Sequence, residues 1–254
     1  MKPFRLTPSL REKIWGRTDL APWHPGDGRK VGEIWFLAEQ ELPILVKLLY
    51  TSEKLSVQVH PDDADGEQGK TEMWYVLRAE PGAALGLGFR QPLTRERLRE
   101  ASLTGEIEHL LRWIPVKPGE AYFAPAHTVH AIGAGLVLCE IQQNADTTYR
   151  LYDYGRPRDL HLERAVELAD LGPHPGASVP DGRVLVRSPH FVTEEFRGPE
   201  TFAGAGRPEW LVAVEGRGTI AGMPFCQGEV WLIPPAAPEF RIEGDARWLR
   251  TWKP

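Results

Sequence analysis

Short runs of alternating hydrophobic and polar residues cover most of the chain, and Gly and Pro separate them. Alternation with a period of two places successive side chains on opposite faces of a β-strand. Many short strands between turn residues are typical of a β-sandwich or barrel, so we expect an all-β protein. The expected strands are 33–38, 42–50, 55–60, 73–77, 83–89 and several within 121–143, followed by RVLVRS, FVTEEF, EWLVAVEG, GTIAG, GEVWLIP and ARWLRTW after residue 183.

Two stretches depart from this alternation and have helical character. Thr94 can cap a helix that continues through 106–114, and Asp159 can cap a helix over 160–169. A segment rich in Pro and Gly follows and is interpreted as a linker. These boundaries predict a first domain over 1–156 with a helical insertion at about 94–114, a helix and linker over 157–183, and a C-terminal β domain over 184–254.

A faint internal repeat relates the two β domains. Gly119–Pro125 and Gly228–Pro234 have the same length and both begin with Gly-Glu. The strand that starts at Glu209 resembles the one that starts at Glu72. Only the first copy has a histidine five residues after its proline, His130, and a histidine-bearing strand before it. We therefore expect a second, metal-free sheet of the same kind; a chance match between short turn patterns is the alternative.

Four polar residues stand where a half-buried sheet would normally carry apolar ones. Gln58 and His60 share one face of the strand 55–60, Glu72 opens the next expected strand, and His130 follows a Pro turn. Two imidazoles, a carboxylate and an amide oxygen suit a divalent ion: zinc, with manganese, iron or nickel as alternatives. Such a ligand set would leave coordination positions of the metal open for water or substrate, which is typical of a catalytic rather than a structural site.

Composition narrows the class of protein further. The 254 residues carry a net charge of −5 and no basic run, which argues against duplex nucleic acid and anionic membranes as partners. The start of the chain lacks the apolar stretch of a signal peptide and no run could span a bilayer, so we expect a cytoplasmic protein. Two lone cysteines are too few for a disulfide framework or a thiolate metal site.

Four segments closely resemble type I mannose-6-phosphate isomerases, the cupin-fold phosphomannose isomerases, and above all their short bacterial members: LSVQVHPDD, GKTEMWYVL, PGEAYFAPAHTVHAIGAG and EIQQNADTTYRLYDYGR. The likeness is strong over about 1–170 and only general in the C-terminal part. It implies a cupin (jelly-roll) barrel followed by a metal-free cupin-like domain. The implied reaction is the interconversion of mannose 6-phosphate and fructose 6-phosphate.

The resemblance also implies roles for individual residues. The ligands of one Zn²⁺ per chain fall on Gln58, His60, Glu72 and His130, and Gln58 is a weak or absent ligand in the shortest members. The implied catalytic residues are Lys70, Glu140 and Arg150, and the implied substrate-binding residues are Lys70, Arg150 and Trp74. Three positions depart from the family pattern: Gly69 replaces a histidine of longer members, His127 replaces the usual turn glycine, and Arg17 stands where the family often has a second glycine.

This chemistry explains why such residue types are needed. The reaction moves a proton between C1 and C2 of the opened sugar, and a divalent cation offsets the charge of the enediolate. Either Glu140 or Lys70 can serve as the base, and the sequence leaves this open. Arg150 can bind the phosphate through paired donors, and alternation places it on one face with Tyr152 and Tyr154.

Two other classes of function remain as alternatives. One is a metal cupin with other chemistry, such as another sugar-phosphate isomerase or a dioxygenase. The other is a regulatory protein that binds a sugar phosphate without turnover. For the isomerase interpretation, the expected partner is a small sugar phosphate, and the expected state is a monomer or a small homo-oligomer.

Overall fold

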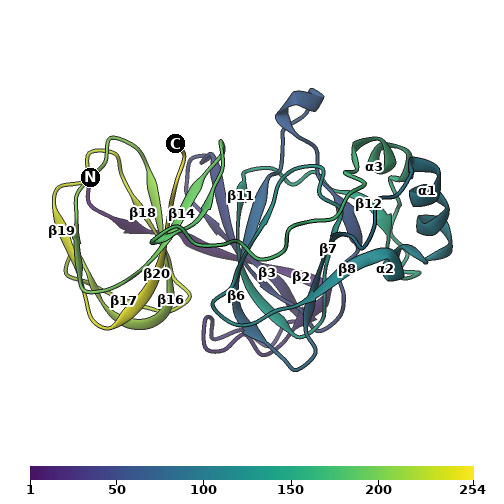
Figure 1. Ribbon diagram of the computed structural model, residues 1–254. Coiled ribbons are helices and arrows are strands. Elements are labelled where there is room, and N and C mark those ends of the chain that lie inside the picture. Colours follow the sequence, from purple (N-terminus) through teal and green to yellow (C-terminus); the bar gives the residue numbers. More distant parts are fainter. The chain divides into compact units, whose positions relative to one another are not determined.

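The computed structural model describes residues 1–254 and is built mostly of β-strands (Figure 1), so the all-β prediction is confirmed. The chain divides into two compact units. Unit 1 contains Met1–Lys13, Arg17–Leu48 and Val179–Pro254, and unit 2 contains Ile14–Gly16 and Leu49–Ser178. No helix has the length and apolar character needed to cross a membrane.

The two units have the following elements. The N-terminal strands are β1 (Phe4–Arg5), β2 (Thr7–Arg17), β3 (Val31–Leu37) and β4 (Ile44–Tyr50). Unit 2 continues with β5 (Val57–Val59), β6 (Glu72–Ala79), β7 (Ala84–Phe89), α1 (Arg95–Thr104), α2 (Ile107–Leu110), β8 (Leu111–Pro115), β9 (Ala121–Ala124), β10 (His130–Ile132), β11 (Leu136–Gln143), β12 (Tyr149–Tyr152) and α3 (Leu162–Leu168). Unit 1 ends with β13 (Val184–Arg187), β14 (Val192–Arg197), β15 (Glu200–Phe202), β16 (Glu209–Ile220), β17 (Met223–Cys226), β18 (Val230–Ile233), β19 (Phe240–Glu243) and β20 (Ala246–Trp252).

Unit 2 holds its main core between two sets of antiparallel strands. One sheet has the order β12-β5-β10-β7-β8, and β6 pairs with both β11 and β9. Leu85 and Leu87 of β7 meet Trp74 and Val76 of β6 in this core, because alternate residues of each strand point inward. The polar residues Glu72 and His130 begin β6 and β10, so they stand where the apolar core gives way to a polar cluster.

A second core in unit 2 lies on the other face of the five-stranded sheet. Val57 and Val59 pack there with residues of α1 and α3, which contact each other and β12 (Figure 1). The valines of β5 are fully buried, and Gln58 between them is half-buried. These valines serve the core beneath the helices, and Gln58 and His60 are left to face the interior of the unit.

The helices differ in part from the expected ones. Thr94 caps α1 by accepting the N–H of Arg97 at 3.2 Å, as predicted. The second expected helix ends at Leu110, and strand β8 follows because its residues pair with β7. The prediction of helix through residue 114 is therefore wrong. Asp159 is not a cap either, because α3 begins two residues after the expected first helical position, with His161 at its N-cap.

The internal repeat is confirmed by strand register. Glu72 of β6 lies opposite Ala124 of β9, and Glu209 of β16 lies opposite Ile233 of β18. In both copies the residue after this partner is the repeated proline. The two glutamates thus occupy matching places in two sheets of the same design.

Glu209 nevertheless has different surroundings from Glu72. Its side chain is 2% exposed, and its Oε2 accepts two hydrogen bonds from the Arg250 guanidinium, at 2.9 Å from Nε and 2.7 Å from Nη2. The same guanidinium binds Glu194 at 3.2 Å. A permanent side-chain cation therefore neutralises the carboxylate of the second copy.

We expect Arg250→Met to lower the free energy of unfolding by about 3 kcal/mol, because it leaves the buried Glu209 carboxylate without its main partner. Urea unfolding would measure the change. Arg241→Met is the matched control, since Arg241 is 64% exposed and lies 3.9 Å from Glu243. Adding Glu209→Met to Arg250→Met should restore most of the loss; equal stability of Arg250→Met and wild type would contradict the assignment.

Candidate functional site

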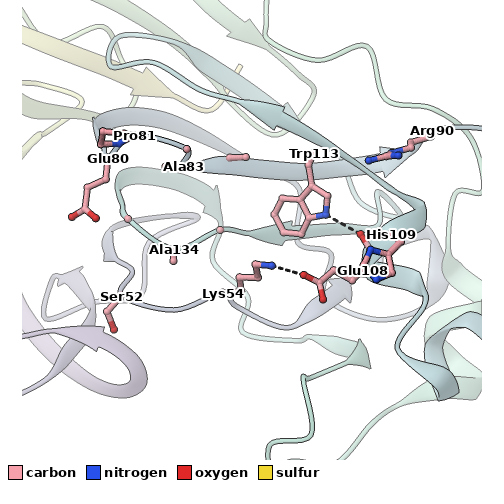
Figure 2. A pocket seen from close by; sticks show the side chains of 14 residues that line it. Ser52, Lys54, Glu80, Pro81, Ala83, Arg90, Glu108, His109, Trp113 and Ala134 are labelled. Carbon is pink, nitrogen blue, oxygen red and sulfur yellow. Dashed lines mark hydrogen bonds and ion pairs between the residues drawn. The ribbon is translucent and has the colours of Figure 1, made fainter.

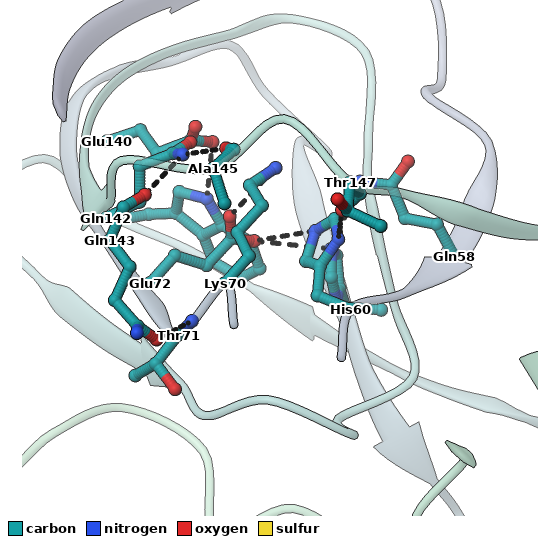
Figure 3. A network of polar contacts seen from close by, with 12 residues as sticks. Gln58, His60, Lys70, Thr71, Glu72, Glu140, Gln142, Gln143, Ala145 and Thr147 are labelled. Atoms are coloured by element: carbon teal, nitrogen blue, oxygen red, sulfur yellow. Dashed lines mark hydrogen bonds and ion pairs between the residues drawn. The ribbon is translucent and has the colours of Figure 1, made fainter. Parts of the chain in front are cut away.

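The buried side chains of His60, Glu72 and His130 in unit 2 converge on one point, and Figure 3 shows His60 and Glu72. Glu72 Oε1 lies 3.3 Å from His130 Nε2 and 3.6 Å from His60 Nε2, and all three side chains are at most 2% exposed. Their potential ligand atoms lie within 4.8 Å of one another. The antiparallel pairing of β10 with β5 creates this meeting, because it sets His130 directly opposite Gln58, two residues before His60.

The two imidazoles are held in one orientation by main-chain carbonyls. His60 Nδ1 lies 2.8 Å from the Thr147 carbonyl, and His130 Nδ1 lies 2.9 Å from the Thr128 carbonyl. A carbonyl only accepts, so each Nδ1 must carry the proton, and each Nε2 lone pair faces Glu72. His60 Nε2 is buried and has no hydrogen-bond partner. Such oriented lone pairs beside a carboxylate fit a divalent cation.

Burial and charge keep this group in its metal-binding protonation state. Burial, aided by the Lys70 ammonium, lowers the pKa of His60 to about 3, and burial also lowers the pKa of His130. Burial alone would raise the pKa of Glu72, but Lys70 and the two histidines together lower it. At neutral pH the cluster is therefore two neutral imidazoles and one carboxylate.

The depressed pKa of His60 predicts how the stability of the metal-free protein depends on pH. Between about pH 3 and the ordinary value of 6.5, the unfolded chain binds a proton that the folded chain excludes. The contribution of His60 to the free energy of unfolding is therefore complete above pH 6.5 and is lost as the pH falls. The free energy of unfolding changes with a limiting slope of about 1.4 kcal/mol per pH unit. Urea unfolding from pH 4 to 8 should show a shallower slope for His60→Gln; identical slopes would refute the assignment.

Gln58 lies at the edge of the cluster. Its Nε2 is 3.2 Å from His130 Nε2, and its Oε1 accepts the Ser56 hydroxyl at 3.0 Å. The amide oxygen therefore points away from the cluster in this arrangement, and a half-turn of the amide would exchange the two ends. Its role as a fourth ligand stays a prediction.

Two of the predicted catalytic residues lie beside the cluster. Lys70 Nζ is 3.4 Å from Glu72 Oε2, and its side chain is 6% exposed. The buried Glu140 accepts the Trp74 indole N–H at 3.1 Å. The Trp74 ring meets the His130 ring with centroids 5.2 Å apart. Trp74 is fully buried and contacts both the Glu140 carboxylate and the His130 ring. It therefore links Glu140 to the cluster.

Arg150 lies in register with Gln58 and His130 across the five-stranded sheet. It pairs with Gln58, which pairs with His130, so the three residues follow one another across β12, β5 and β10. Its Nε donates to the Asp159 carbonyl at 2.9 Å. The expected shared face with Tyr152 is wrong, because a bulge between Arg150 and Tyr152 turns the tyrosine toward the core beneath the helices.

Two of the departures from the family pattern, Gly69 and His127, have structural consequences. A Cβ at Gly69 would lie 2.6 Å from the Asp63 backbone nitrogen, so the loop before Lys70 has no room for a side chain there. His127 adopts a left-handed backbone with φ of 70°. Its Nε2 contacts Asp65 at 2.6 Å, and its backbone N–H donates to the His60 carbonyl. The imidazole is thus engaged outside the histidine–glutamate cluster.

The sequence analysis missed several residues that support the site. Gln142 is fully buried opposite Glu72, and its Nε2 donates to the carbonyls of Gln143 and Ala145. Its position two residues after Glu140 on the same face was a usable signal. The sequence carries no signal for the roles of the Thr128 and Thr147 carbonyls, because every residue has a main-chain carbonyl.

Comparison with known proteins gives concordant results. The family model for the catalytic domain of type I phosphomannose isomerase matches residues 28–81. The chain is 32% identical to mannose-6-phosphate isomerase ManA of Bacillus subtilis over 98% of each chain. It is 35% identical to mannose-6-phosphate isomerase of Streptococcus mutans, over 80% of this chain and 72% of that protein.

Solved structures agree with this relationship. The crystal structure of mannose 6-phosphate isomerase from Bacillus subtilis matches with a TM-score of 0.87 and 27% identity, over 99% of each chain. A putative mannosephosphate isomerase from Archaeoglobus fulgidus shares the fold at a TM-score of 0.82 and 18% identity, over 98% of this chain and 97% of that one. The expected cupin fold is therefore confirmed.

Proposed function

Because the chain belongs to the type I mannose-6-phosphate isomerase family, we propose that His60, Glu72 and His130 hold a zinc ion where mannose 6-phosphate and fructose 6-phosphate interconvert through an enediolate. The observation that carries this proposal is the buried His60 Nε2, which has no hydrogen bond and faces a carboxylate. Two imidazoles and one carboxylate are a donor set that zinc accepts with a position left open for substrate. Manganese, iron and nickel accept the same donors.

Gln58 is the proposed fourth ligand. Its side chain already touches His130, and reversing its amide would turn the oxygen toward the cluster. The Ser56 hydroxyl can then donate its hydrogen bond elsewhere or accept one from the amide nitrogen. This ligand is the weakest of the four because its present partner competes for the amide.

The proposed mechanism gives each neighbouring side chain one task. A bound divalent cation supplies Lewis-acid stabilisation of the negative charge that develops on the two sugar oxygens. Glu140 takes the carbon-bound proton and returns it to the neighbouring carbon, as a carboxylate positioned by Trp74. Lys70, already paired with Glu72, donates a hydrogen bond to a substrate oxygen. Arg150 binds the phosphate with its remaining guanidinium donors.

We also propose that the protein acts on free sugar phosphate in the cytoplasm, as a monomer or a small homo-oligomer. Its two cysteines, the buried Cys139 and the exposed Cys226, are free, which fits a reducing compartment. All the proposed catalytic residues fall within 1–156, the proposed catalytic cupin domain; the cupin-like domain over 184–254 carries none of them.

A coupled assay of fructose 6-phosphate formation from mannose 6-phosphate tests the function. We expect activity in metal-replete protein, its loss after chelation and its return with zinc. Activity that survives complete metal removal would overturn the metal proposal. Folded, metal-replete protein that binds the sugar phosphate without turnover would support a regulatory protein instead, and oxygen consumption would support a dioxygenase.

A further inference from the structure

A groove in unit 2 holds a second group of charged and aromatic side chains (Figure 2). It has a volume of about 530 Å³, within the range of about 300–1,000 Å³ that is usual for small-molecule sites. Its side chains come from Lys54, Glu80, Arg90, Glu108, His109 and Trp113. Small residues in the turns 81–84 and 133–135 leave its wall open to a ligand.

One end of the groove, at Glu80, lies at the far end of β6 from Glu72, whereas Trp113 lies opposite Gly86, whose neighbour Leu87 pairs with His130. Glu72 begins β6, and Glu80 directly follows its last residue, Ala79. Eight residues of extended chain span roughly 25 Å at about 3.3 Å each. Glu80 is therefore far from the cluster, and Trp113 packs against the core beneath the helices, on the face of the sheet opposite His130, so a ligand in the groove would bind apart from the metal site.

Trp113 offers a fixed aromatic surface in this groove. Its indole N–H donates to the Glu108 carbonyl at 2.9 Å, and it is half-buried opposite Gly86, whose missing side chain leaves room for the ring. The Lys54 ammonium lies 5.4 Å from the ring centroid and is paired with the Glu108 carboxylate. The negative face of such a ring attracts the polarised C–H groups of a sugar.

Basic side chains lie at one end of the groove and an acidic side chain lies at the other. Figure 2 shows Arg90 and His109 on one side of Trp113 and Glu80 on the other. The Arg90 backbone N–H donates to the Leu110 carbonyl at 3.0 Å, which keeps Arg90 beside His109. Both side chains are exposed, and neither has a hydrogen-bond or ion-pair partner in the chain. Guanidinium and imidazole donors suit a phosphate, and a carboxylate accepts from sugar hydroxyls.

We propose that this groove binds a phosphorylated monosaccharide, with the phosphate at Arg90 and His109, the sugar ring over Trp113 and its hydroxyls toward Glu80. The site goes beyond the proposed function, because it requires neither the metal nor turnover. Its occupant carries the same chemistry as the substrate, so the protein would hold a second equivalent of sugar phosphate.

Equilibrium dialysis with radiolabelled fructose 6-phosphate tests the proposal, since the label counts both sugar phosphates alike after isomerisation. Wild-type holoenzyme should bind two equivalents per chain. Arg90→Gln and Glu80→Gln should each weaken one of the two sites at least tenfold and leave kcat/KM at low substrate unchanged. Arg99→Gln, an exposed arginine outside the groove that pairs with Glu163, is the matched control and should bind like wild type.

Equal binding by wild type and Arg90→Gln would overturn the proposal. Inorganic phosphate that binds the groove as tightly as fructose 6-phosphate would overturn the sugar component, whereas at least tenfold weaker binding would support it. The isomerase assay is read independently of the dialysis, so the two proposals can fail separately. A protein without isomerase activity that still loses one equivalent on Arg90→Gln would therefore refute the proposed function and support the groove.

Discussion

Replacing Glu72 with glutamine is expected to lower kcat/KM at least about a thousandfold, because a cation at the cluster supplies several kcal/mol of transition-state stabilisation. The substitution keeps the shape of the side chain and removes its charge. It leaves two imidazole lone pairs without the carboxylate that they face, and it removes the Glu72 charge that Lys70 contacts. Metal content per chain and coupled-assay kinetics should fall together.

Glu120→Gln is the control for this experiment. Glu120 is a carboxylate of the same unit that accepts the Tyr122 hydroxyl and the Lys117 backbone N–H, away from the cluster. It should retain both metal and activity. Thermal unfolding of each variant would exclude a loss of fold. A folded Glu72→Gln protein with full metal content and wild-type kcat/KM would show that the cluster does not serve the reaction.

Glu140→Gln should reduce kcat by about 10²–10⁴, the usual contribution of a general base, with little change in metal content. Glu140 lies in the same buried network but binds the Trp74 indole rather than the two histidines. The amide preserves that hydrogen bond, because its oxygen can accept the same N–H. A large fall in kcat at constant metal content would separate proton transfer from metal binding.

Solvent deuterium distinguishes Glu140 from Lys70 as the base. If Glu140 removes the carbon-bound proton, Glu140→Gln should stop incorporation of deuterium into the sugar, and Lys70→Met should slow turnover while exchange remains measurable. Glu167→Gln, which replaces a 67%-exposed carboxylate in the same unit, should exchange like wild type. The reverse result, with exchange lost only in Lys70→Met, would make Lys70 the base.

Alternation, a Pro turn and the family resemblance together pointed to the residues that form the cluster. Gln58 and His60 share one face of an alternating strand with Ser56, and Glu72 begins a run of buried residues. Gln58 and His60 stood out because a period of two puts an amide and an imidazole side by side on one face. The spacing of Gly119–Pro125 and Gly228–Pro234 similarly revealed the repeat, since turn residues are constrained locally.

Other features depend on contacts that local patterns do not encode. The bulge before Tyr152 inserts one residue into β12, so alternation assigned the tyrosine to the wrong face. The strand from Leu111 forms because β7 offers it hydrogen bonds, although the preceding residues continue a helical pattern. Likewise, the pairing of Glu209 with Arg250 joins residues 41 positions apart. Tertiary pairing outweighs local preference in each case.

The anchoring of both imidazoles on main-chain carbonyls has a consequence for how the protein can evolve. The groups that orient His60 and His130 belong to Thr147 and Thr128, but the threonine side chains take no part in those two contacts. Any amino acid that preserves the local backbone path provides the same acceptor. Relatives can therefore carry other residues at these two positions without changing the tautomers of the histidines. A conserved threonine at either position is not required for an intact metal site.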